Sequence, residues 1–151
     1  MDSPSVLDLL PQLASGAPHT HALALEFVGV EADVVTLKAP FREDLVGDPE
    51  LNVLAGGVVT TLLDHVGGLA VWTALGRYAP IATLDMRIDY MRPAEPGMDV
   101  LARARCYKLT RSVGFVRAWA YDRDPDDPVA AAQAAYMLNE NAARRAKGGA
   151  A

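Results

Sequence analysis

The sequence predicts an α+β fold, in which one long helix packs against an antiparallel sheet of five or six strands. Residues 58–75 are apolar almost all round, which is typical of a helix buried on most sides. Residues 81–92 alternate with a period of two, which is typical of a half-buried strand. At 151 residues, 51% of them hydrophobic, the chain can bury such a helix in one domain. We expect this domain to span residues 1–140, with residues 141–151 as a flexible tail.

The N-terminal segment predicts a short helix that covers an edge of the core. Capping residues at positions 3–5 precede an apolar face, and Gly16 is a stop signal. The apolar face consists of Val6, Leu9, Leu10 and Leu13.

The next segments indicate a hairpin and a loop. Residues 22–28 and 31–39 are rich in strand-forming residues, and Gly29 between them favours a tight turn. Residues 40–49 are charged and turn-forming, so we expect a loop there that leads into the long helix.

The alternation in residues 81–92 assigns each side chain to a face of the strand. We expect the even-numbered apolar residues to lie on the long helix; they are Ala82, Leu84, Met86, Ile88 and Tyr90. The odd-numbered residues should face away from it; they are Thr83, Asp85, Arg87 and Asp89. Residues 100–109 and 113–121 follow, and their short connection predicts a second hairpin.

The last element, residues 129–138, carries conflicting signals. Four of the five residues from 130 to 134 are alanine, which favours a helix, whereas the position after a series of strands favours a closing strand. Pro128 at its start and the aromatic Tyr136 suit an edge position, so we predict an edge strand.

The charge of the chain and its lack of visible targeting segments argue against binding to nucleic acid or to a membrane. The net charge is −5, and the one basic cluster, Arg144, Arg145 and Lys147, is a poor footprint for nucleic acid. No uninterrupted apolar run of spanning length and no basic leader is visible. We expect a cytoplasmic protein that binds neither nucleic acid nor membrane.

Potential metal ligands are few. Cys106 is the only cysteine, which excludes an internal disulfide and a cysteine-built metal site and favours a small core residue. His19 and His21 lack an acidic or cysteine partner at ligand spacing. We therefore expect no metal.

One acid, Asp64, interrupts the long apolar helix. Together with positions 60, 61, 67 and 68 it forms the only polar, roomy stripe on that helix. An ionised carboxylate without partners in a dry core costs several kcal/mol. Asp64 is thus either a structural acid bonded to a threonine of the stripe or to His65, or a cleft-facing general base or nucleophile.

The pair Gly56-Gly57 also has two interpretations. It is either a simple turn into the helix or a helix start whose bare N–H, at the positive end of the helix dipole, suits a developing oxyanion. Seven residues of helix separate Gly57 from Asp64, which is about 10 Å at roughly 1.5 Å per residue. One carbonyl cannot touch both groups. If both act in one reaction, the site is shared across a two-fold dimer.

These residues resemble a known family. The glycine pair, Asp64, residues 83–94 and Gly97 are similar to the hotdog-fold acyl-CoA thioesterases of the phenylacetyl-CoA thioesterase-like branch, and the resemblance runs from about residue 52 to 138. It implies a long central helix wrapped by a curved antiparallel sheet, in a homodimer whose sheets join and often in a dimer of dimers. It also implies hydrolysis of an acyl-CoA thioester to acid and CoA, with no cofactor other than the CoA ester itself.

The same resemblance implies three catalytic residues. The N–H of Gly57 polarises the thioester carbonyl, Asp64 is the base or nucleophile, and Thr83 helps to hold the lytic water. Candidate substrate-binding residues are Asn52, Gly56, Thr61, Arg92 and Arg111, although Asn52 lies closer to the glycines than the family pattern implies. Exposed cations near strand ends or turns, namely Arg92, Lys108 and Arg111, are candidates for the CoA phosphates.

Ala55 departs from the family pattern, which usually has histidine before the glycine pair. His65 is no replacement for it, because it lies about 100° round the helix from Asp64. Three functions stay open: an acyl-CoA hydrolase, a non-catalytic acyl-CoA-binding hotdog protein, and a hotdog dehydratase, for which no His/Asp pair is apparent. The acyl group depends on side chains such as Trp72, Met86 and Tyr90.

Overall fold

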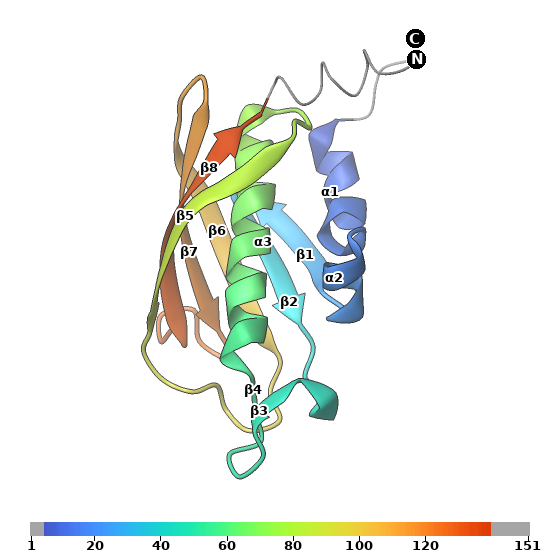
Figure 1. The fold of residues 1–151 in the computed structure, drawn as a ribbon, viewed down its shortest axis with the longest axis vertical. Helices are drawn as coiled ribbons and strands as arrows, with labels where there is room; N and C mark the ends of the chain where they lie inside the picture. Colours follow the sequence, from blue (N-terminus) through green and yellow to red (C-terminus); the bar gives the residue numbers. More distant parts are fainter. Residues whose placement is uncertain (1–4, 140–151) are drawn as a thin grey trace.

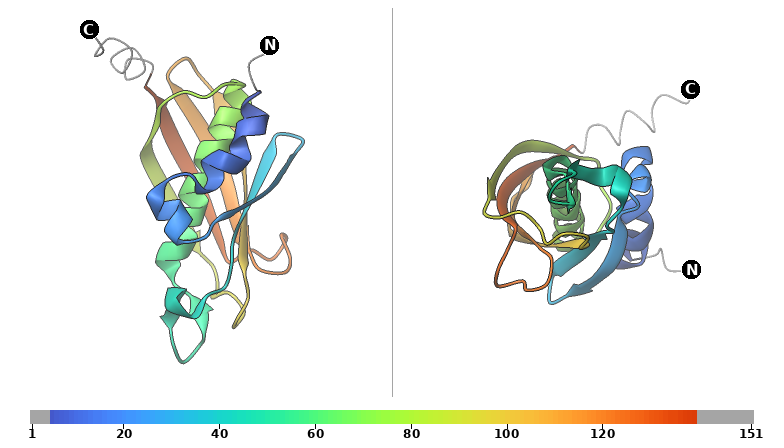
Figure 2. Two further views of the ribbon diagram at one scale, coloured as in Figure 1. Left: turned by 90° about the vertical axis from the view of Figure 1, so that its right-hand side faces the viewer. Right: turned by 90° about the horizontal axis from the view of Figure 1, so that it is seen from below.

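The computed structural model describes residues 5–139, and the predicted tail at 141–151 lies outside them. A long helix, α3 (Gly56–Leu75), runs along one six-stranded antiparallel sheet, with α1 (Val6–Ser15) and α2 (Pro18–Ala22) beside it (Figure 1). Viewed end-on, the sheet curls around α3 (Figure 2). The strand order is β1-β2-β6-β7-β8-β5, which confirms the predicted α+β fold. The bounds are β1 Glu26–Glu31, β2 Val34–Ala39, β5 Ile81–Tyr90, β6 Val100–Leu109, β7 Val113–Tyr121 and β8 Ala130–Leu138.

Helix α3 is the centre of the hydrophobic core. Half of its twenty residues are buried, and it ends at Gly76, which adopts a left-handed conformation (φ 71°) and bonds back to the last turn. Among the described helices, α3 alone is long and apolar enough to cross a membrane. Its apolar character is explained by the sheet that encloses it, because the core of a soluble fold needs the same composition.

The N-terminal helix α1 forms as predicted. Ser5 and Asp8 make a reciprocal capping box at its start. Val6, Leu10 and Ala14 are buried where α1 packs on α3 and β1.

A β-bulge in β5 makes the predicted face assignment of that strand wrong in its first half. The pairing of β5 with β8 shifts between Thr83 and Asp85, which inserts one extra residue. Ahead of the bulge, Ile81 and Thr83 face α3, and beyond it the even positions from Met86 onward do. Leu84 is consequently 55% exposed, and Ala82 is exposed too. A one-residue insertion reverses every side chain that precedes it.

The prediction of a strand at residues 129–138 is confirmed, but its edge position is wrong. β8 pairs with both β7 and β5, and the edge strands of the six-stranded sheet are β1 and β5. Pro128 lies before the first residue of β8, so it removes no hydrogen bond from the ladder and does not prevent an interior position.

Two local predictions near the N-terminus are wrong. The β1–β2 turn lies at Ala32 and Asp33, both with positive φ (46° and 66°), which suits the twist of a two-residue hairpin. Gly29 lies instead at a bulge inside β1, and Ala22 ends α2. In the segment expected to be a loop, a short 3-10 helix (Glu43–Leu45) is followed by β3 (Val46–Asp48), which pairs with β4 (Val53–Leu54). The predicted hairpin of β6 and β7 is confirmed.

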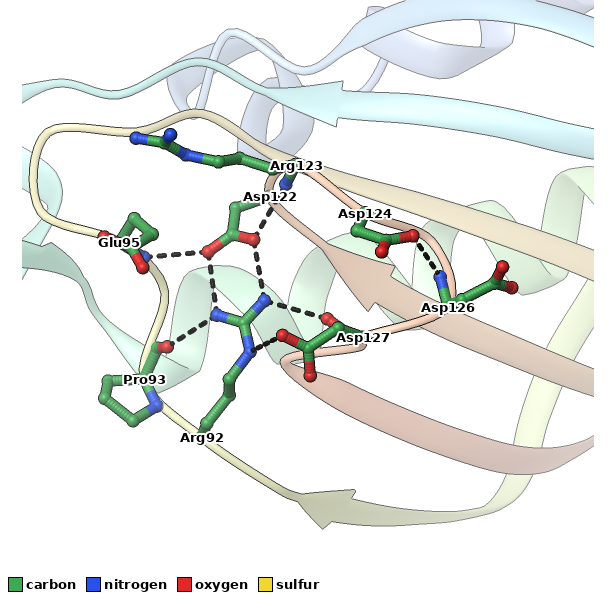
Figure 3. A network of polar contacts seen from close by, with 8 residues as sticks. All are labelled: Arg92, Pro93, Glu95, Asp122, Arg123, Asp124, Asp126 and Asp127. Atoms are coloured by element: carbon green, nitrogen blue, oxygen red, sulfur yellow. Dashed lines mark hydrogen bonds and ion pairs between the residues drawn. The ribbon is translucent and has the colours of Figure 1, made fainter.

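Arg92 joins two loops through a nearly buried ion pair (Figure 3). Its guanidinium donates to both carboxylate oxygens of Asp122 at 2.9 and 2.7 Å, and the Asp122 side chain is 1% exposed. Two backbone N–H groups, of Glu95 and Arg123, also donate to that carboxylate. These contacts, with the Arg92 hydrogen bond first, hold the pKa of Asp122 far below its usual range. The pair therefore stays ionised at neutral pH.

We predict that Arg92→Met lowers the free energy of unfolding by about 3 kcal/mol, because it leaves a buried carboxylate without its cation. Urea unfolding at pH 7 measures this loss. Arg87→Met is the matched control: Arg87 is 77% exposed and its partner Asp89 is also exposed, so we expect a loss of at most about 1 kcal/mol. Equal losses in the two variants would contradict the structural role of Arg92.

Candidate active site

One face of α3 carries the predicted catalytic groups. Gly57, Thr61, Asp64 and Gly68 follow one another at helical spacing along this face. Beside the second half of the face lies a cleft of about 360 Å³. It is lined by Asp64, His65, Gly68, Trp72, Tyr78, Pro80, Ile81, Thr83 and Tyr136. The acid of the apolar helix therefore opens onto a cleft lined by both polar and apolar side chains.

Asp64 is held by hydroxyl groups from two strands. Thr83 donates to its Oδ1 at 2.8 Å. Tyr136 donates to its backbone carbonyl at 2.7 Å and lies 3.4 Å from the same Oδ1. The stripe threonines are not its partners, because Thr60 and Thr61 donate to carbonyls one turn back along α3. Asp64 is only partly buried, so a carboxylate with bonded hydroxyls also stays open to the cleft.

The start of α3 leaves a backbone donor accessible. Gly57 is exposed, and a side chain added there would meet nothing within 4 Å. Within residues 5–139, no acceptor bonds to the N–H of Gly57, whereas Val58 and Val59 both donate to the carbonyl of Ala55. A free N–H at the positive end of a 20-residue helix is a donor suited to an oxyanion.

His65 is a structural residue that bonds to α1 and not to Asp64. Its Nε2 lies 3.0 Å and 2.9 Å from the carbonyl oxygens of Leu13 and Ala14, so Nε2 carries the proton and donates to the end of α1. Burial lowers the pKa of His65, which keeps the ring neutral. The ring is therefore not a substitute for an imidazole at position 55.

Ala55, which stands where the family usually has histidine, lies against Gly47 of β3. A Cβ at Gly47 would lie 2.6 Å from the Cα of Ala55, so the two backbones are in close contact.

Another imidazole, that of His19, reaches the active face from α2 and lies 3.4 Å from the hydroxyl of Thr61.

The remaining predicted binding residues are spread over the molecule. Asn52 has a positive φ of 52° in the β3–β4 turn, and its carbonyl accepts from Gly97. Nη1 and Nη2 of Arg92 donate within the loop network described above, and its Nε lies in an ion pair with Asp127. Arg111 and Lys108 are exposed near the β6–β7 turn, and β7 passes Val71 close to the C-terminal end of α3, far from Gly57.

Tyr136 is a site residue that sequence reasoning did not find. The alternation of β8 would have placed it on the same face as the buried alanines at positions 130, 132 and 134. Of the residues expected to shape the acyl pocket, Trp72 lines the cleft. Met86 packs against the core, and Tyr90 donates to the carbonyl of Gly56.

Comparison with known proteins identifies the family. The family model described as thioesterase superfamily matches residues 51–129, which is just over half of the chain. Protein VNG_1336C of Halobacterium salinarum is 35% identical over 98 residues, which span 60% of this chain and 64% of that protein. Medium/long-chain acyl-CoA thioesterase YigI of Escherichia coli is 27% identical over 134 residues, which span 80% of this chain and 85% of YigI.

Solved structures agree with these matches. A Pseudomonas aeruginosa protein is 37% identical, with a TM-score of 0.80 over 87% of this chain and 98% of that one. The phenylacetic acid degradation protein PaaI of Thermus thermophilus is 25% identical, with a TM-score of 0.68 over 81% of this chain and 99% of that one.

The fold is thus the hotdog fold, with a long central helix wrapped by a six-stranded sheet. The chain belongs to the thioesterase superfamily, which confirms the resemblance found in the sequence.

We predict a pH-dependent component of stability that originates at His65. Because burial lowers its folded pKa below the unfolded value of about 6.5, this component is complete above that pH and is lost as pH falls toward the folded pKa, by up to about 1.4 kcal/mol per pH unit. Urea unfolding from pH 8 to 5 measures it. The slope should be smaller in His65→Gln, and the exposed control His21→Gln should keep it. An unchanged slope in His65→Gln would contradict a buried, neutral ring.

Proposed function

We propose that this protein hydrolyses acyl-CoA thioesters to the free acid and CoA. The observation that carries the proposal is the placement of Asp64: it is bonded to Thr83, opens onto a cleft that Trp72 and Ile81 help to line, and shares one helix face with the free N–H of Gly57. Acyl transfer to water requires an acid or nucleophile beside a cleft and an oxyanion donor, and both are present on this surface. The names of relatives such as YigI support the same reaction.

In the proposed reaction, Asp64 deprotonates a water or attacks the thioester carbonyl directly. The hydroxyl of Thr83, whose proton is donated to Asp64, keeps lone pairs with which it can orient that water. The N–H of Gly57 donates to the negative oxygen of the tetrahedral intermediate, the C–S bond then breaks, and the proton that Asp64 took from water passes to the sulfur, so that CoA leaves as the thiol. In the direct route, the attack of Asp64 forms an acyl-Asp64 anhydride and releases CoA, and a water molecule then hydrolyses the anhydride to the free acid. We expect no metal or cofactor to take part, so a chelator should leave turnover unchanged.

A site shared by two chains follows from the length of α3. The helix is continuous between Gly57 and Asp64, so the two groups are about 10 Å apart along its axis. We infer that Gly57 of one copy faces Asp64 of a second. The edge strand β5 supports this arrangement, because it is ten residues long, unpaired on one side within the described chain, and exposes Leu84. Pairing of two β5 edges would give a two-fold dimer, and such dimers can pair again.

The substrate's two ends suit different surfaces. The acyl group would enter the cleft beside Trp72 and Tyr78, whose rings lie 5.0 Å apart. The name of YigI makes medium and long acyl chains the first to test. Exposed Lys108 and Arg111 stay candidates for the CoA phosphates, whereas the Arg92 donors already have partners. A cytoplasmic location, with no nucleic acid or membrane partner, also belongs to this proposal.

Two other functions make different predictions. A non-catalytic acyl-CoA-binding protein would bind CoA esters without releasing thiol from any of them. A dehydratase would hydrate crotonyl-CoA. The geometry favours hydrolysis over dehydration, because His65 is committed to the carbonyl groups of α1 and does not pair with Asp64.

We predict that Asp64→Asn lowers thiol release from acyl-CoA by about a hundredfold or more, because the amide can neither accept a proton nor attack. The assay runs a panel of acyl-CoA esters with a thiol reagent, and gel filtration checks that the variant remains assembled. Asp33→Asn, in the exposed β1–β2 turn, is the charge-matched control and should keep full activity. A fully active Asp64→Asn protein would show that the mechanism is wrong.

Subunit mixing tests the shared site. Gly57→Pro removes the proposed donor at a position in the first helical turn where proline is tolerated, and should be inactive. When Gly57→Pro and Asp64→Asn chains are unfolded together and refolded in equal amounts, we predict about a quarter of wild-type activity. Half of the dimers are then mixed, and each of these holds one complete site of two. No recovery in mixtures that contain mixed dimers would contradict a shared site.

A further inference from the structure

Tyr136 enters the site from the sheet side, beneath Asp64. It belongs to β8, is 2% exposed, and is the largest of the fully buried side chains. Its hydroxyl is the one polar atom of this side chain, and it reaches both the backbone carbonyl and Oδ1 of Asp64. Thr83, which is opposite Tyr136 in the β5–β8 ladder, donates to the same oxygen. Thr83 thus donates fully to Oδ1, whereas the single proton of the Tyr136 hydroxyl is shared between the Asp64 carbonyl at 2.7 Å and Oδ1 at 3.4 Å.

Gly67 makes this arrangement possible. A Cβ at position 67 would lie 2.1 Å from the hydroxyl oxygen of Tyr136 and 2.9 Å from the ring carbon that carries it. Both distances are shorter than any ordinary contact, so a side chain there would displace the ring. Glycine in a helix interior costs about 1 kcal/mol relative to alanine, and the approach of Tyr136 accounts for its presence here.

Tyr136 stays protonated, so its hydroxyl can always donate a hydrogen bond. Burial, with a smaller effect from the Asp64 charge, raises the pKa of the phenol far above its ordinary value. The hydroxyl therefore keeps its proton over the whole pH range in which a thioester can be assayed. Within residues 5–139, nothing donates to Oδ2 of Asp64, so the two oxygens of the carboxylate differ in their surroundings.

We propose that Tyr136 is a positioning residue: together with Thr83 it holds Oδ1 of Asp64, so that Oδ2 is the oxygen presented to the cleft. This inference rests on the proposed function, because it concerns the orientation of the acid that attacks or activates water. A carboxylate on an exposed helix rotates about its side-chain bonds. Thr83 fixes one carboxylate oxygen, and Tyr136 contacts that oxygen as well as the backbone carbonyl of the same residue, which removes that freedom before the substrate binds. The 3.4 Å separation fits an unliganded site, in which such contacts are often long.

The test is a comparison of kcat and KM in Tyr136→Phe, which keeps the ring and removes the hydroxyl. We expect kcat to fall about tenfold, the effect of losing roughly one hydrogen bond to a charged group, with KM unchanged. Measurement well below the melting temperature keeps the protein folded, so a merely structural role would leave kcat unchanged. Tyr107→Phe, on the exposed outer face of the sheet, is the matched control and should behave as wild type.

Coupling with Thr83 gives a second readout. Since both hydroxyls hold the same oxygen, the double variant Tyr136→Phe/Thr83→Val should lose less than the product of the two single losses. Gly67→Ala provides an independent route, because it displaces Tyr136 while favouring the helix, and it should lower kcat by a similar factor.

The outcomes separate this inference from the proposed function. If Asp64→Asn is inactive but Tyr136→Phe turns over at the wild-type rate, the positioning role is overturned and the hydrolase stands. Multiplicative losses in the double variant would overturn it as well. If Asp64→Asn is fully active, the catalytic role of Asp64 fails, and the positioning role fails with it.

Discussion

The structure depends on one requirement, which is that α3 must be covered on nearly every side. A helix that is apolar all round cannot face water, so the sheet curls around it and α1 closes part of the remaining face. The same enclosure creates the need for hydroxyl partners at Asp64, because a carboxylate that enters this surrounding would lose several kcal/mol of solvation. The fold and the site therefore share a cause: the strands that cover the helix also supply the groups that hold its acid, Thr83 from β5 and Tyr136 from β8.

The bulge in β5 connects sheet geometry to chemistry. With uninterrupted alternation, the strand that buries Met86 and Ile88 would turn Thr83 away from the helix. The extra residue between Thr83 and Asp85 lets one strand present a hydroxyl to Asp64 and, further along, apolar side chains to the core. It also exposes Leu84, which lies on β5, one of the two edge strands of the sheet. The same bulge thus directs Thr83 to Asp64 and exposes Leu84 at the interface of the proposed dimer.

The sequence could predict the features whose signals lie in neighbouring residues. Periodicity identified α3 and the strands, and the spacing of Gly57 and Asp64 on one helix was sufficient to suggest a divided site. Tyr136 could not be found in this way, because its contact with Asp64 joins residues 72 positions apart and depends on the β5–β8 register. The bulge was hidden for the same reason, since an alternating sequence does not show where a partner strand shifts. The position of Gly29 was misleading because Ala32 and Asp33 adopt the positive φ angles that glycine would have suggested.

Arg92, which the sequence suggested as a substrate-binding residue, supports the site indirectly by holding loops in place. Its pairing with Asp122 fixes the loop after β5, and Glu95 of that loop donates to the same carboxylate. Two residues further on, the N–H of Gly97 bonds to the carbonyl of Asn52, which lies just before β4 and the start of α3. A chain of fixed contacts therefore runs from a buried ion pair to the turn that presents Gly57. The two halves of the proposed site are supported differently: Asp64 by hydroxyls of the sheet, and Gly57 by a loop anchored through charge. Since a 1 Å displacement of a reacting group can cost about a hundredfold in rate, both supports bear on catalysis although neither needs to touch the substrate.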